Sequence, residues 1–461
     1  MALERTLIEK YGVDTKGPYY TSYPTLGEWS EKFTEKDFAE GLSRFIDQKK
    51  ENEFSLYVHY PFCVELCHFC ICNAHVTHNE ERKRDALDKI ISELDLFERF
   101  FGQKGSIPKI KEVHLGGGSP SLLEERDFEK LAGRIKSIAP LSELEDFALE
   151  IDPRTASPEK MAFYADQGID RISFGIQDFN PQVQSAVNRV QSLELVESLI
   201  VPQIRRRFKS LNFDVLYGLP LQTLESFRET IETVTRIAPE RITLLRYAHI
   251  PERVPHMRLI NEADIVGNDE KTEMFVETVR ALLNAGYEHV GIDNFAKSHN
   301  DLAKAFREKK VGRNFVGFTP GRVHNNMIGI GPSATSVFGD VYSQNVYHPT
   351  DYSKSGVGER FPIERGHIMS RDDIIRRDII FGILCHRSIN WSQIGREYSI
   401  DPEVYFAEES GDLQRLQDDG LITRTSESLE VTPSGRFFIR HIAKPFDKYL
   451  RQKQEYKIHG T

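Results

Sequence analysis

The sequence predicts an α/β fold in which a parallel βα barrel carries an N-terminal extension and a mostly helical C-terminal domain. From Phe54 onward, short apolar stretches alternate with longer stretches whose apolar residues recur at helical spacing. This alternation favours βαβ units, because a helical crossover returns the chain to a parallel neighbouring strand. With 461 residues, 39% of them hydrophobic and 28% charged, the chain has a globular composition and can bury a large core. We expect three parts, covering residues 1–53, 54–366 and 367–461.

The first part is polar and contains three local signals. Leu7–Tyr11 predicts a helical turn, and Thr34–Phe45 predicts an amphipathic helix. Between them, Gly17–Thr25 holds two prolines and three tyrosines and is typical of an extended segment.

The second part contains seven predicted strands and four long predicted helices. The strands are Phe54–His59, Glu112–Leu115, Phe147–Asp152, Arg171–Ile176, Leu211–Tyr217, Arg241–Tyr247 and Tyr287–Asp293. The helices are Glu80–Phe100, Glu124–Ile138, Ser157–Gln167 and Leu224–Ile237. Beyond them we expect a helix at Lys297–Lys310 and a loop at residues 348–366. The small residues of Met327–Gly339 favour either a close backbone approach to a ligand or a tightly packed turn.

Polar residues stand at the ends of most predicted strands. In a parallel barrel the carboxyl ends of the strands hold the ligand site. Any one of these residues could equally be a turn or helix-capping residue. Their recurrence around one barrel nevertheless favours a site that includes Glu150, Asp152, Gln177, Asp178, Asp214, Tyr247, His249 and Asp293.

The third part resembles a winged-helix arrangement. Three helices, Asp372–Cys385, Asn390–Tyr398 and Pro402–Asp419, precede a hairpin of Leu421–Thr425 and Leu429–Thr432 and a helix at Ser434–Leu450. Winged helices often bind DNA, but a net charge of −10 and a pI near 5.9 argue against a nucleic-acid partner. A structural lid is therefore the favoured interpretation.

Cysteine usage and the start of the chain favour the cytoplasm. Five cysteines, four of them clustered, are not typical of a secreted disulfide framework. The charged start, MALERTLIEKYGVDTKG, has no apolar core, so we expect no signal peptide. The sequence contains no apolar run of about 18 residues, so we expect no membrane span.

The clustered cysteines lie in Tyr57–Thr77, directly after the first predicted strand. They are Cys63, Cys67, Cys70 and Cys72, and the fifth, Cys385, is remote. Thiolates suit zinc, copper(I) or iron–sulfur clusters. Structural zinc, with His68, His75 or His78 as further ligands, is one interpretation, and packed thiols without metal are another. The third is a [4Fe–4S] cluster held by three thiolates. Such clusters usually take four cysteines, so a set of three leaves one iron open.

Gly116, Gly117 and Gly118, followed by Ser119, come directly after the second strand. Residues without Cβ allow backbone to approach a ligand closely, although a glycine run alone is more often a turn. The C-x3-C-x2-C spacing of Cys63, Cys67 and Cys70, placed before such a loop, resembles the radical S-adenosylmethionine (SAM) superfamily.

More specifically, the chain resembles the family of oxygen-independent coproporphyrinogen III oxidases. The similar blocks include GP-Y-YTSYPT, YVHYPFC, LGGGSPSLL, EIDPR, SFGIQDFN, FDVLYGLP, YAHIP, RNFVGFT and YLRQK. The resemblance implies a partial (β/α)6 radical SAM barrel, a [4Fe–4S] cluster and two SAM molecules. It also implies decarboxylation of two propionates of coproporphyrinogen III, an electron donor such as a flavodoxin or ferredoxin, and a monomer. The N-terminal extension would close over the site.

The resemblance assigns roles to individual residues. Cys63, Cys67 and Cys70 would ligate the cluster, and Cys72 and Tyr57 would be catalytic. The first SAM would contact Tyr57, Gly117, Glu150, Ala248 and Thr335. The second would lie among Phe69, Gly118, Ser119, Gln177, Arg189 and Asp214.

Three positions depart from the family pattern. Ile71 replaces an expected glycine, Thr335 an expected isoleucine, and Tyr19 an expected arginine near the substrate. The retained Cys72 favours the oxidase branch over a heme-binding or heme-transfer relative. A radical SAM enzyme acting on another tetrapyrrole is a further alternative.

Overall fold

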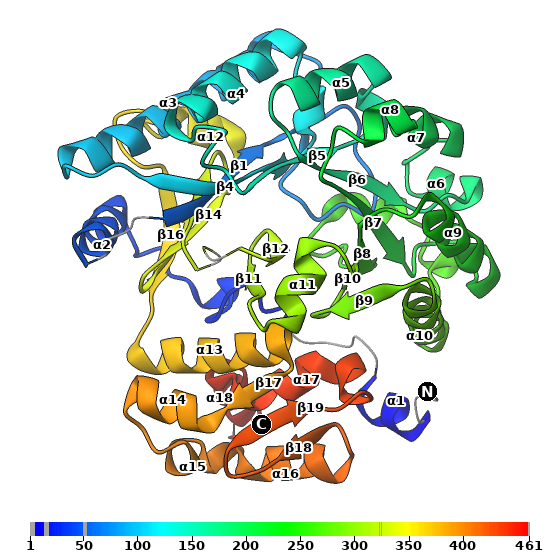
Figure 1. Cartoon of the computed structure of the whole chain (residues 1–461), viewed down its shortest axis with the longest axis vertical. Helices are drawn as coiled ribbons and strands as arrows, with labels where there is room; N and C mark the ends of the chain where they lie inside the picture. Colours follow the sequence, from blue (N-terminus) through cyan, green and yellow to red (C-terminus); the bar gives the residue numbers. More distant parts are fainter. Residues whose placement is uncertain (1–4, 13–17, 49–52, 322, 324, 460–461) are drawn as a thin grey trace.

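A twelve-stranded sheet forms the centre of the described part of the chain, in the order β16-β15-β14-β13-β1-β4-β5-β6-β7-β8-β10-β9. The computed structural model describes residues 5–12, 18–48, 53–321, 323 and 325–459. Helices cover the outer face of the sheet, and the C-terminal domain lies beneath it in Figure 1. This is a mixed α/β fold with a central parallel barrel, as the sequence predicts.

Six parallel strands form the barrel, as expected from the first six apolar stretches. They are β1 Glu53–Tyr60, β4 Lys109–Gly117, β5 Asp146–Ile151, β6 Arg171–Gln177, β7 Ser210–Tyr217 and β8 Arg241–Arg246. The connecting helices are α3 Glu80–Gln103, α4 Glu125–Ile138, α5 Pro158–Asp166, α6 Pro181–Ala186, α7 Leu193–Leu199, α8 Pro202–Arg205 and α9 Leu224–Ile237. The strands are rich in fully buried residues because helices cover one face and the barrel interior the other.

The prediction that Tyr287–Asp293 forms a seventh barrel strand is wrong. Tyr287–Val290 (β9) turns back into Asn294–Lys297 (β10), and β10 pairs antiparallel with both β8 and β9. Gly291 makes the turn with φ 64°, and a Cβ there would lie 2.1 Å from the ring of Phe318. Asp293 therefore follows a hairpin turn at the sheet edge and is not at a barrel strand end.

Residues 297–368 extend the sheet on its other side. The strands are β13 Met327–Ile330, parallel to β1, then β14 Thr335–Phe338, β15 Val341–Asn345 and β16 Ile363–Ile368. The predicted loop at 348–366 is wrong, since it contains helix α12 Pro349–Lys354 and most of β16. The helix expected at Lys297–Lys310 is shorter, α11 Asp301–Arg307, because Lys297 ends β10. Two short strands, β11 Gly312–Asn314 and β12 Gly317–Thr319, pair beside the barrel.

The C-terminal domain is winged-helix-like, as predicted. Its helices are α13 Arg371–His386, α14 Trp391–Tyr398, α15 Pro402–Tyr405, α16 Ser410–Asp418, α17 Ile439–Ala443 and α18 Lys448–His459. Its small sheet has the order β17-β19-β18, with β17 Ser388–Asn390, β18 Ile422–Arg424 and β19 Ser428–Val431. The single helix expected at Ser434–Leu450 is interrupted around Pro445, where proline cannot continue the hydrogen-bond ladder.

The N-terminal extension joins the barrel to the C-terminal domain. Helix α1 Arg5–Tyr11 docks on that domain through Lys10 Nζ and Asp419 Oδ2, 2.6 Å apart. Tyr20 Oη donates to Asp447 Oδ2 at 3.0 Å. Helix α2 Glu35–Gln48 buries Phe38, Leu42 and Phe45 against the sheet, so the predicted amphipathic helix is confirmed.

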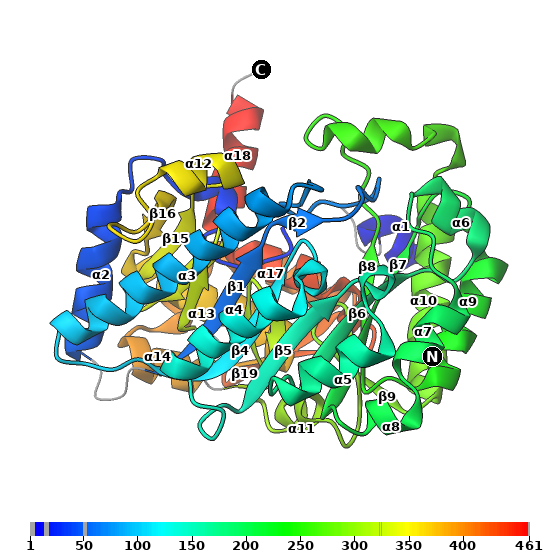
Figure 2. The same cartoon turned by 90° about the horizontal axis from the view of Figure 1, so that it is seen from above.

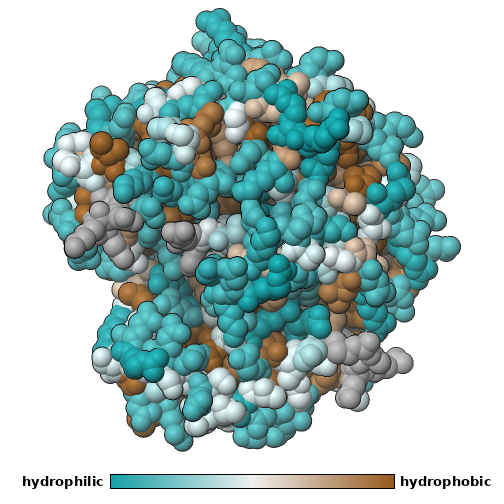
Figure 3. Space-filling view, in the orientation of Figure 1, coloured by the Kyte–Doolittle hydropathy of each residue, from teal (hydrophilic) through white to brown (hydrophobic). Residues whose placement is uncertain are grey.

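Hydrophilic residues cover most of the face seen in Figure 3, and apolar residues are scattered among them. None of the helices in the described ranges is long and apolar enough to span a membrane.

Candidate functional site

The cysteine loop leaves the carboxyl end of β1 and is held by several separate elements. It begins with β2 Phe62–Cys63 and ends with β3 His75–Val76, and these two short strands pair. Between them, His68 N donates to Val187 O at 3.0 Å and Asn188 Nδ2 to Leu66 O at 2.9 Å. The loop lies on the same side of the molecule as α12 and the segment that follows β8 (Figure 2).

Two more contacts attach the loop to those neighbours. His256 Nε2, from the segment after β8, donates to Cys70 O at 2.7 Å. Asn73 Nδ2 donates to Tyr347 O at 2.7 Å, just before α12. The loop has little secondary structure of its own, so these tethers set the directions of its thiols.

The thiols of Cys63, Cys67 and Cys70 lie close enough to affect one another's charge. Burial, with the charge of Cys70 next, raises the pKa of Cys63 to about 12. Burial also raises the pKa of Cys67, although the charges of Arg189 and Arg154 oppose it. A cation that binds them displaces these protons, because the thiolate is the form that ligates metal. The donor set therefore fits a [4Fe–4S] cluster.

Cys72 lies beside this group and is hydrogen-bonded to Cys70. It is an exposed residue, whereas Cys67 is buried. A hydrogen bond from the Cys72 thiol lowers the pKa of Cys70 to about 7, and the same bond raises the pKa of Cys72 well above its usual range. Cys72 is thus the proton-bearing partner beside the three thiols.

A polar chain runs from β1 into this loop. Tyr57 Oη donates to His59 Nδ1 at 3.0 Å, and His59 Nε2 donates to Asn73 O at 3.0 Å. Burial lowers the pKa of His59, so its ring is neutral and accepts from Tyr57. Burial, with the charge of Glu150, raises the pKa of Tyr57 well above its usual range and keeps the phenol protonated.

Glu150 on β5 presents its carboxylate to the barrel interior. His114 Nε2 donates to Oε1 at 2.8 Å and Gly117 N to Oε2 at 3.3 Å, while 40% of the Glu150 side chain stays exposed. Burial alone would raise its pKa, but the hydrogen bond and charge of His114 lower it. An ionised, partly open carboxylate suits hydroxyl groups or a cationic sulfonium.

The glycine run fits against these groups. A Cβ at Gly116 would lie 2.8 Å from the Glu150 carboxylate, and one at Gly117, where φ is 110°, would lie 2.7 Å from the His59 ring. At Gly118 a Cβ would meet Phe62 O at 2.6 Å. The glycines therefore let β4 pass close to the carboxylate and the cysteine loop, and the Cβ-free backbone makes a cradle.

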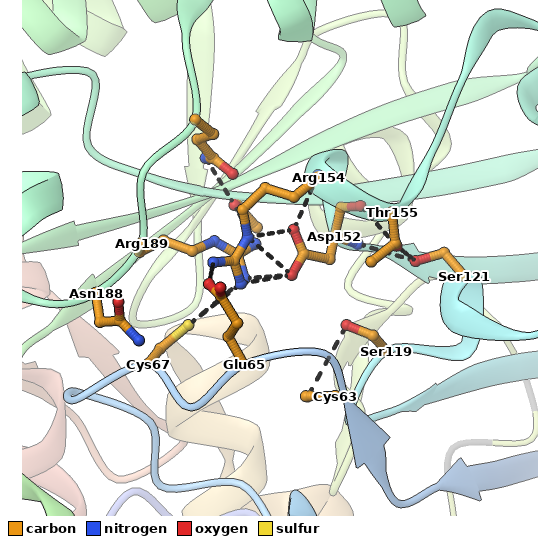
Figure 4. A network of polar contacts seen from close by, with 12 residues as sticks. Cys63, Glu65, Cys67, Ser119, Ser121, Asp152, Arg154, Thr155, Asn188 and Arg189 are labelled. Atoms are coloured by element: carbon orange, nitrogen blue, oxygen red, sulfur yellow. Dashed lines mark hydrogen bonds and ion pairs between the residues drawn. The ribbon is translucent and has the colours of Figure 1, made fainter. Parts of the chain in front are cut away.

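Arg189 and Arg154 converge on Asp152 and Cys67 (Figure 4). Arg189 Nη1 lies 2.8 Å from Asp152 Oδ2 and Arg154 Nη2 lies 2.8 Å from the same oxygen. Arg189 Nη2 also donates to Gly175 O at 2.9 Å. Within the described structure the buried Arg189 Nε has no hydrogen-bond partner. That unpaired donor fits an anionic ligand group, such as the carboxylate of SAM.

Asp214 and Gln177 lie farther along the barrel. Asp214 accepts from Ser173 Oγ at 2.9 Å and from Asn212 Nδ2 at 2.8 Å. Burial, with the charge of Glu150, raises the pKa of Asp214. The pKa values of the two carboxyl groups thus shift in opposite directions, down for Glu150 and up for Asp214. Gln177 ends β6 in the left-handed region, with φ 66°.

Within the described residues, the side chains of the other expected cofactor residues make no hydrogen bond with this network. Ser119 is the exception, since the Cys63 thiol donates to its Oγ at 3.9 Å. Phe69, between two proposed ligands, packs on the small apolar cluster of Leu216, Leu219 and Met257. Ala248 is exposed after β8. Thr335 is 6% exposed and begins β14.

Sequence reasoning missed His59, His114, Asn73 and Arg154 as members of the site. Tyr57 and His59 are two apart on one strand, so alternation places both on one face. The same two-residue alternation places His114 and Gly116 on one face of β4. Arg154 carries no comparable signal, because its approach to Cys67 depends on two distant loops.

Comparisons with known proteins match the whole chain. Residues 57–234 match the family model of the radical SAM superfamily, and residues 369–438 match that of the HemN C-terminal domain. The oxygen-independent coproporphyrinogen III oxidase of Pseudomonas aeruginosa is 36% identical over 446 residues, 96% of this chain and 95% of the relative. The Escherichia coli protein of that name is 35% identical over 447 residues, 97% and 95% of the two chains.

A solved structure extends the match to the fold. The structure described as coproporphyrinogen III oxidase (HemN) from Escherichia coli aligns with a TM-score of 0.89 and 34% identity, over 97% of this chain and 99% of that one. Fold and site together define a radical SAM protein with a [4Fe–4S] cluster and SAM as cofactors. Within that superfamily, the chain belongs to the family of oxygen-independent coproporphyrinogen III oxidases.

Proposed function

We propose that this chain converts two propionate side chains of coproporphyrinogen III to vinyl groups, without oxygen, and so forms protoporphyrinogen IX. The relatives named for this activity match over 95% of their lengths. The observation that carries the proposal is the loop after β1, which presents Cys63, Cys67 and Cys70, with the Cys72 thiol hydrogen-bonded beside them to Cys70. Since such clusters usually take four cysteines, three leave one iron open.

When bound, the reduced cluster and SAM supply a carbon radical that takes a hydrogen atom from the β-carbon of a propionate. Loss of carbon dioxide from that propionate, with transfer of one electron to an external electron acceptor, would then leave the vinyl group. Protein residues bind and orient the reactants. The protonated phenol of Tyr57 remains a hydrogen-bond donor, and the exposed thiol of Cys72 stands where it can exchange a proton with a reactant. We therefore assign Tyr57 and Cys72 as the catalytic residues.

Two SAM molecules are part of this proposal. The first would lie against Glu150 and the glycine cradle, with Tyr57, Gly117, Ala248 and Thr335. The unpaired Arg189 Nε supports a carboxylate of a second molecule, among Phe69, Gly118, Ser119, Gln177 and Asp214. Burial raises the pKa of Asp214, and its carboxyl group suits a hydroxyl partner.

The N-terminal extension, residues 1–53, would close over the substrate. Tyr19 stands where an arginine is expected, but the Arg440 guanidinium lies over the Tyr19 ring, 4.6 Å from its centroid. Arg313 donates to Tyr19 O and Tyr20 O, both at 3.1 Å. Cations from other parts of the chain thus reach this segment, which supports binding of a substrate with four propionates.

We further propose that the protein acts as a cytoplasmic monomer and takes electrons from a flavodoxin or ferredoxin. We retain the division into an extension at 1–53, a barrel domain at 54–366 and a C-terminal domain at 367–461. The acidic charge of −10 supports the absence of a nucleic-acid partner.

The test is turnover by the reconstituted protein without oxygen, given SAM, a reductant and coproporphyrinogen III. We expect protoporphyrinogen IX together with 5′-deoxyadenosine. Cleavage of SAM without vinyl formation would point to another tetrapyrrole. Stoichiometric heme binding without SAM cleavage would point to heme transfer, and zinc in place of iron would refute the radical proposal.

A further inference from the structure

The Cys67 sulfur differs from the other proposed ligand sulfurs in its neighbours. Arg154 Nη2 donates to it at 3.6 Å and Arg189 Nη1 at 3.7 Å. Among the described residues, the Cys63 thiol instead donates a hydrogen bond to a hydroxyl, Ser119 Oγ. Figure 4 shows both guanidinium groups pointing toward Cys67 from different parts of the barrel.

Arg154 is held rigidly in this position. Its Nε donates to Asp152 Oδ1 at 3.1 Å and its Nη2 to Asp152 Oδ2 at 2.8 Å. Its Nη1 reaches Glu65 Oε2 at 3.0 Å, on the cysteine loop itself. The side chains of Arg154 and Asp152 are 13% and 3% exposed, so solvent screens this group weakly.

Asp152 acts as a clamp between the two arginines, because its Oδ2 also accepts from Arg189 Nη1 at 2.8 Å. It follows β5 directly and caps the single-turn helix Pro153–Thr155 by accepting from Arg154 N at 3.0 Å. The backbone that places Asp152 therefore also places Arg154. Arg189 is accounted for as a proposed SAM contact, whereas Arg154 has no assigned role.

We propose that Arg154 is a positioning residue for the iron–sulfur cluster, which fixes the Cys67 sulfur and raises the reduction potential of the cluster. Hydrogen bonds to the sulfurs are one of the factors that set cluster potentials. An electron taken up by the cluster adds negative charge at its thiolates, and a nearby N–H donor on a cation stabilises that charge. The inference rests on the proposed function, since it requires a cluster at these cysteines.

The Glu65 carboxylate allows a test of the direction in which the reduction potential shifts. A purely structural salt bridge between Arg154 and Glu65 predicts that removal of either partner loosens the loop in the same way. An electrostatic role predicts opposite shifts, because one variant removes a positive charge near Cys67 and the other a negative charge. Glu65 is 56% exposed, so its effect is the smaller of the two.

The experiment is a redox titration of the reconstituted protein without SAM, followed by the electron paramagnetic resonance signal of the reduced cluster. Arg154→Met is expected to lower the reduced-to-oxidised ratio about tenfold at a fixed potential, which is 59 mV for one electron. Glu65→Gln is expected to raise the ratio. Arg134→Met is the matched control, because Arg134 is 16% exposed, is bridged by Asp95 and Glu98, and lies on α4.

An unchanged potential in Arg154→Met with full iron content would overturn the proposal, as would shifts of the same sign in Arg154→Met and Glu65→Gln. If Arg154→Met does not hold iron, Glu65→Gln decides, and an unchanged or lowered potential there overturns the proposal. Failure of the wild-type protein to take up a reducible cluster would instead refute the proposed function.

Discussion

Removal of the Tyr352 hydroxyl should destabilise this protein more at alkaline than at acidic pH. The hydroxyl donates to Glu93 Oε2 at 2.5 Å, and Gly331 N donates to the same oxygen at 2.8 Å. Asn345 Nδ2 donates to the other oxygen at 2.7 Å. Glu93 is 2% exposed, and burial raises its pKa from 4.5 to about 7. The three donors partly offset the cost of burying the carboxylate.

The sign follows from the raised pKa. Between pH 4.5 and about 7 the folded protein holds a proton that the unfolded chain has released, so Glu93 lowers stability as pH rises through this range. The accumulated loss is about 3 kcal/mol, and it becomes constant above about pH 7. Above about pH 7 the Tyr352 hydroxyl donates to the ionised carboxylate of Glu93, whereas at lower pH it donates to the neutral carboxylic acid.

A hydrogen bond to a charged group contributes about 1.5–3 kcal/mol and one between neutral groups about 0.5–1.5 kcal/mol. Tyr352→Phe should therefore reduce the free energy of unfolding by about 2 kcal/mol at about pH 8.5 and by about 1 kcal/mol at about pH 5.5. The assay is urea unfolding of the cluster-free protein at both pH values, followed by far-ultraviolet circular dichroism.

Tyr164→Phe is the control for this prediction. Tyr164 is equally buried, and its hydroxyl donates to the neutral carbonyl of Ser121 at 3.3 Å. Its loss should be the same at both pH values. An equal loss for Tyr352→Phe at both pH values, or a greater loss in acid, would refute the reasoning that Glu93 ionises near neutrality.

Three further predictions concern the site. Replacement of any one proposed ligand, Cys63, Cys67 or Cys70, by serine should abolish iron binding and the visible absorption of the cluster. Cys72→Ser should instead keep the cluster and impair turnover. Glu150→Gln should weaken SAM binding about tenfold, about 1.4 kcal/mol, in equilibrium dialysis, and unchanged affinity would count against the assignment. Gly117→Ala should cost about 1–3 kcal/mol in thermal unfolding, because the Cβ would meet the His59 ring at 2.7 Å. Gly133→Ala, with nothing within 4 Å of the added Cβ in α4, should instead stabilise by about 0.5–1 kcal/mol, and the reverse order would contradict the packing argument.

The barrel could be predicted because its strands are buried on both faces. β7, Ser210–Tyr217, is buried at nearly every position, and its sequence SLNFDVLY alternates apolar residues with polar ones before ending in an apolar run. β16, Ile363–Ile368, was missed because it is an edge strand, and its sequence IERGHI is half polar. The predicted strand Tyr287–Asp293 covers β9 and the turn after it, whereas β10, Asn294–Lys297, was missed because its sequence NFAK is short and half polar.

The small-residue segment Met327–Gly339 shows how an ambiguous pattern was resolved. It folds into β13 and β14, and Gly329 lies so close to β14 that a Cβ would be 2.3 Å from Thr335 O. Gly331, with φ 101°, would bring a Cβ to 2.4 Å from His59 O. Tight backbone packing explains these glycines, and it places the segment beside β1 at the site.

The contacts of Cys67 could not be predicted, because they join parts of the chain that are 87 and 122 residues away. Spacing identifies a thiol as a ligand, but its neighbours depend on how three loops meet. The same limit applies to Glu93 on α3, whose sequence context is that of an ordinary surface helix. Its burial results from Gly331 and Tyr352, more than 200 residues later, as separations of 238 and 259 show.

These distant contacts give the cysteine loop its geometry. A loop with little secondary structure does not set the directions of its thiols alone. Val187 after α6, His256 after β8 and Tyr347 before α12 each hydrogen-bond to it. Tyr347 lies in the sheet extension beyond the six barrel strands, and Glu93 secures that extension through Gly331. The extension is therefore part of the active-site scaffold, because a shift in it would move Asn73 and with it the loop that carries the proposed ligands.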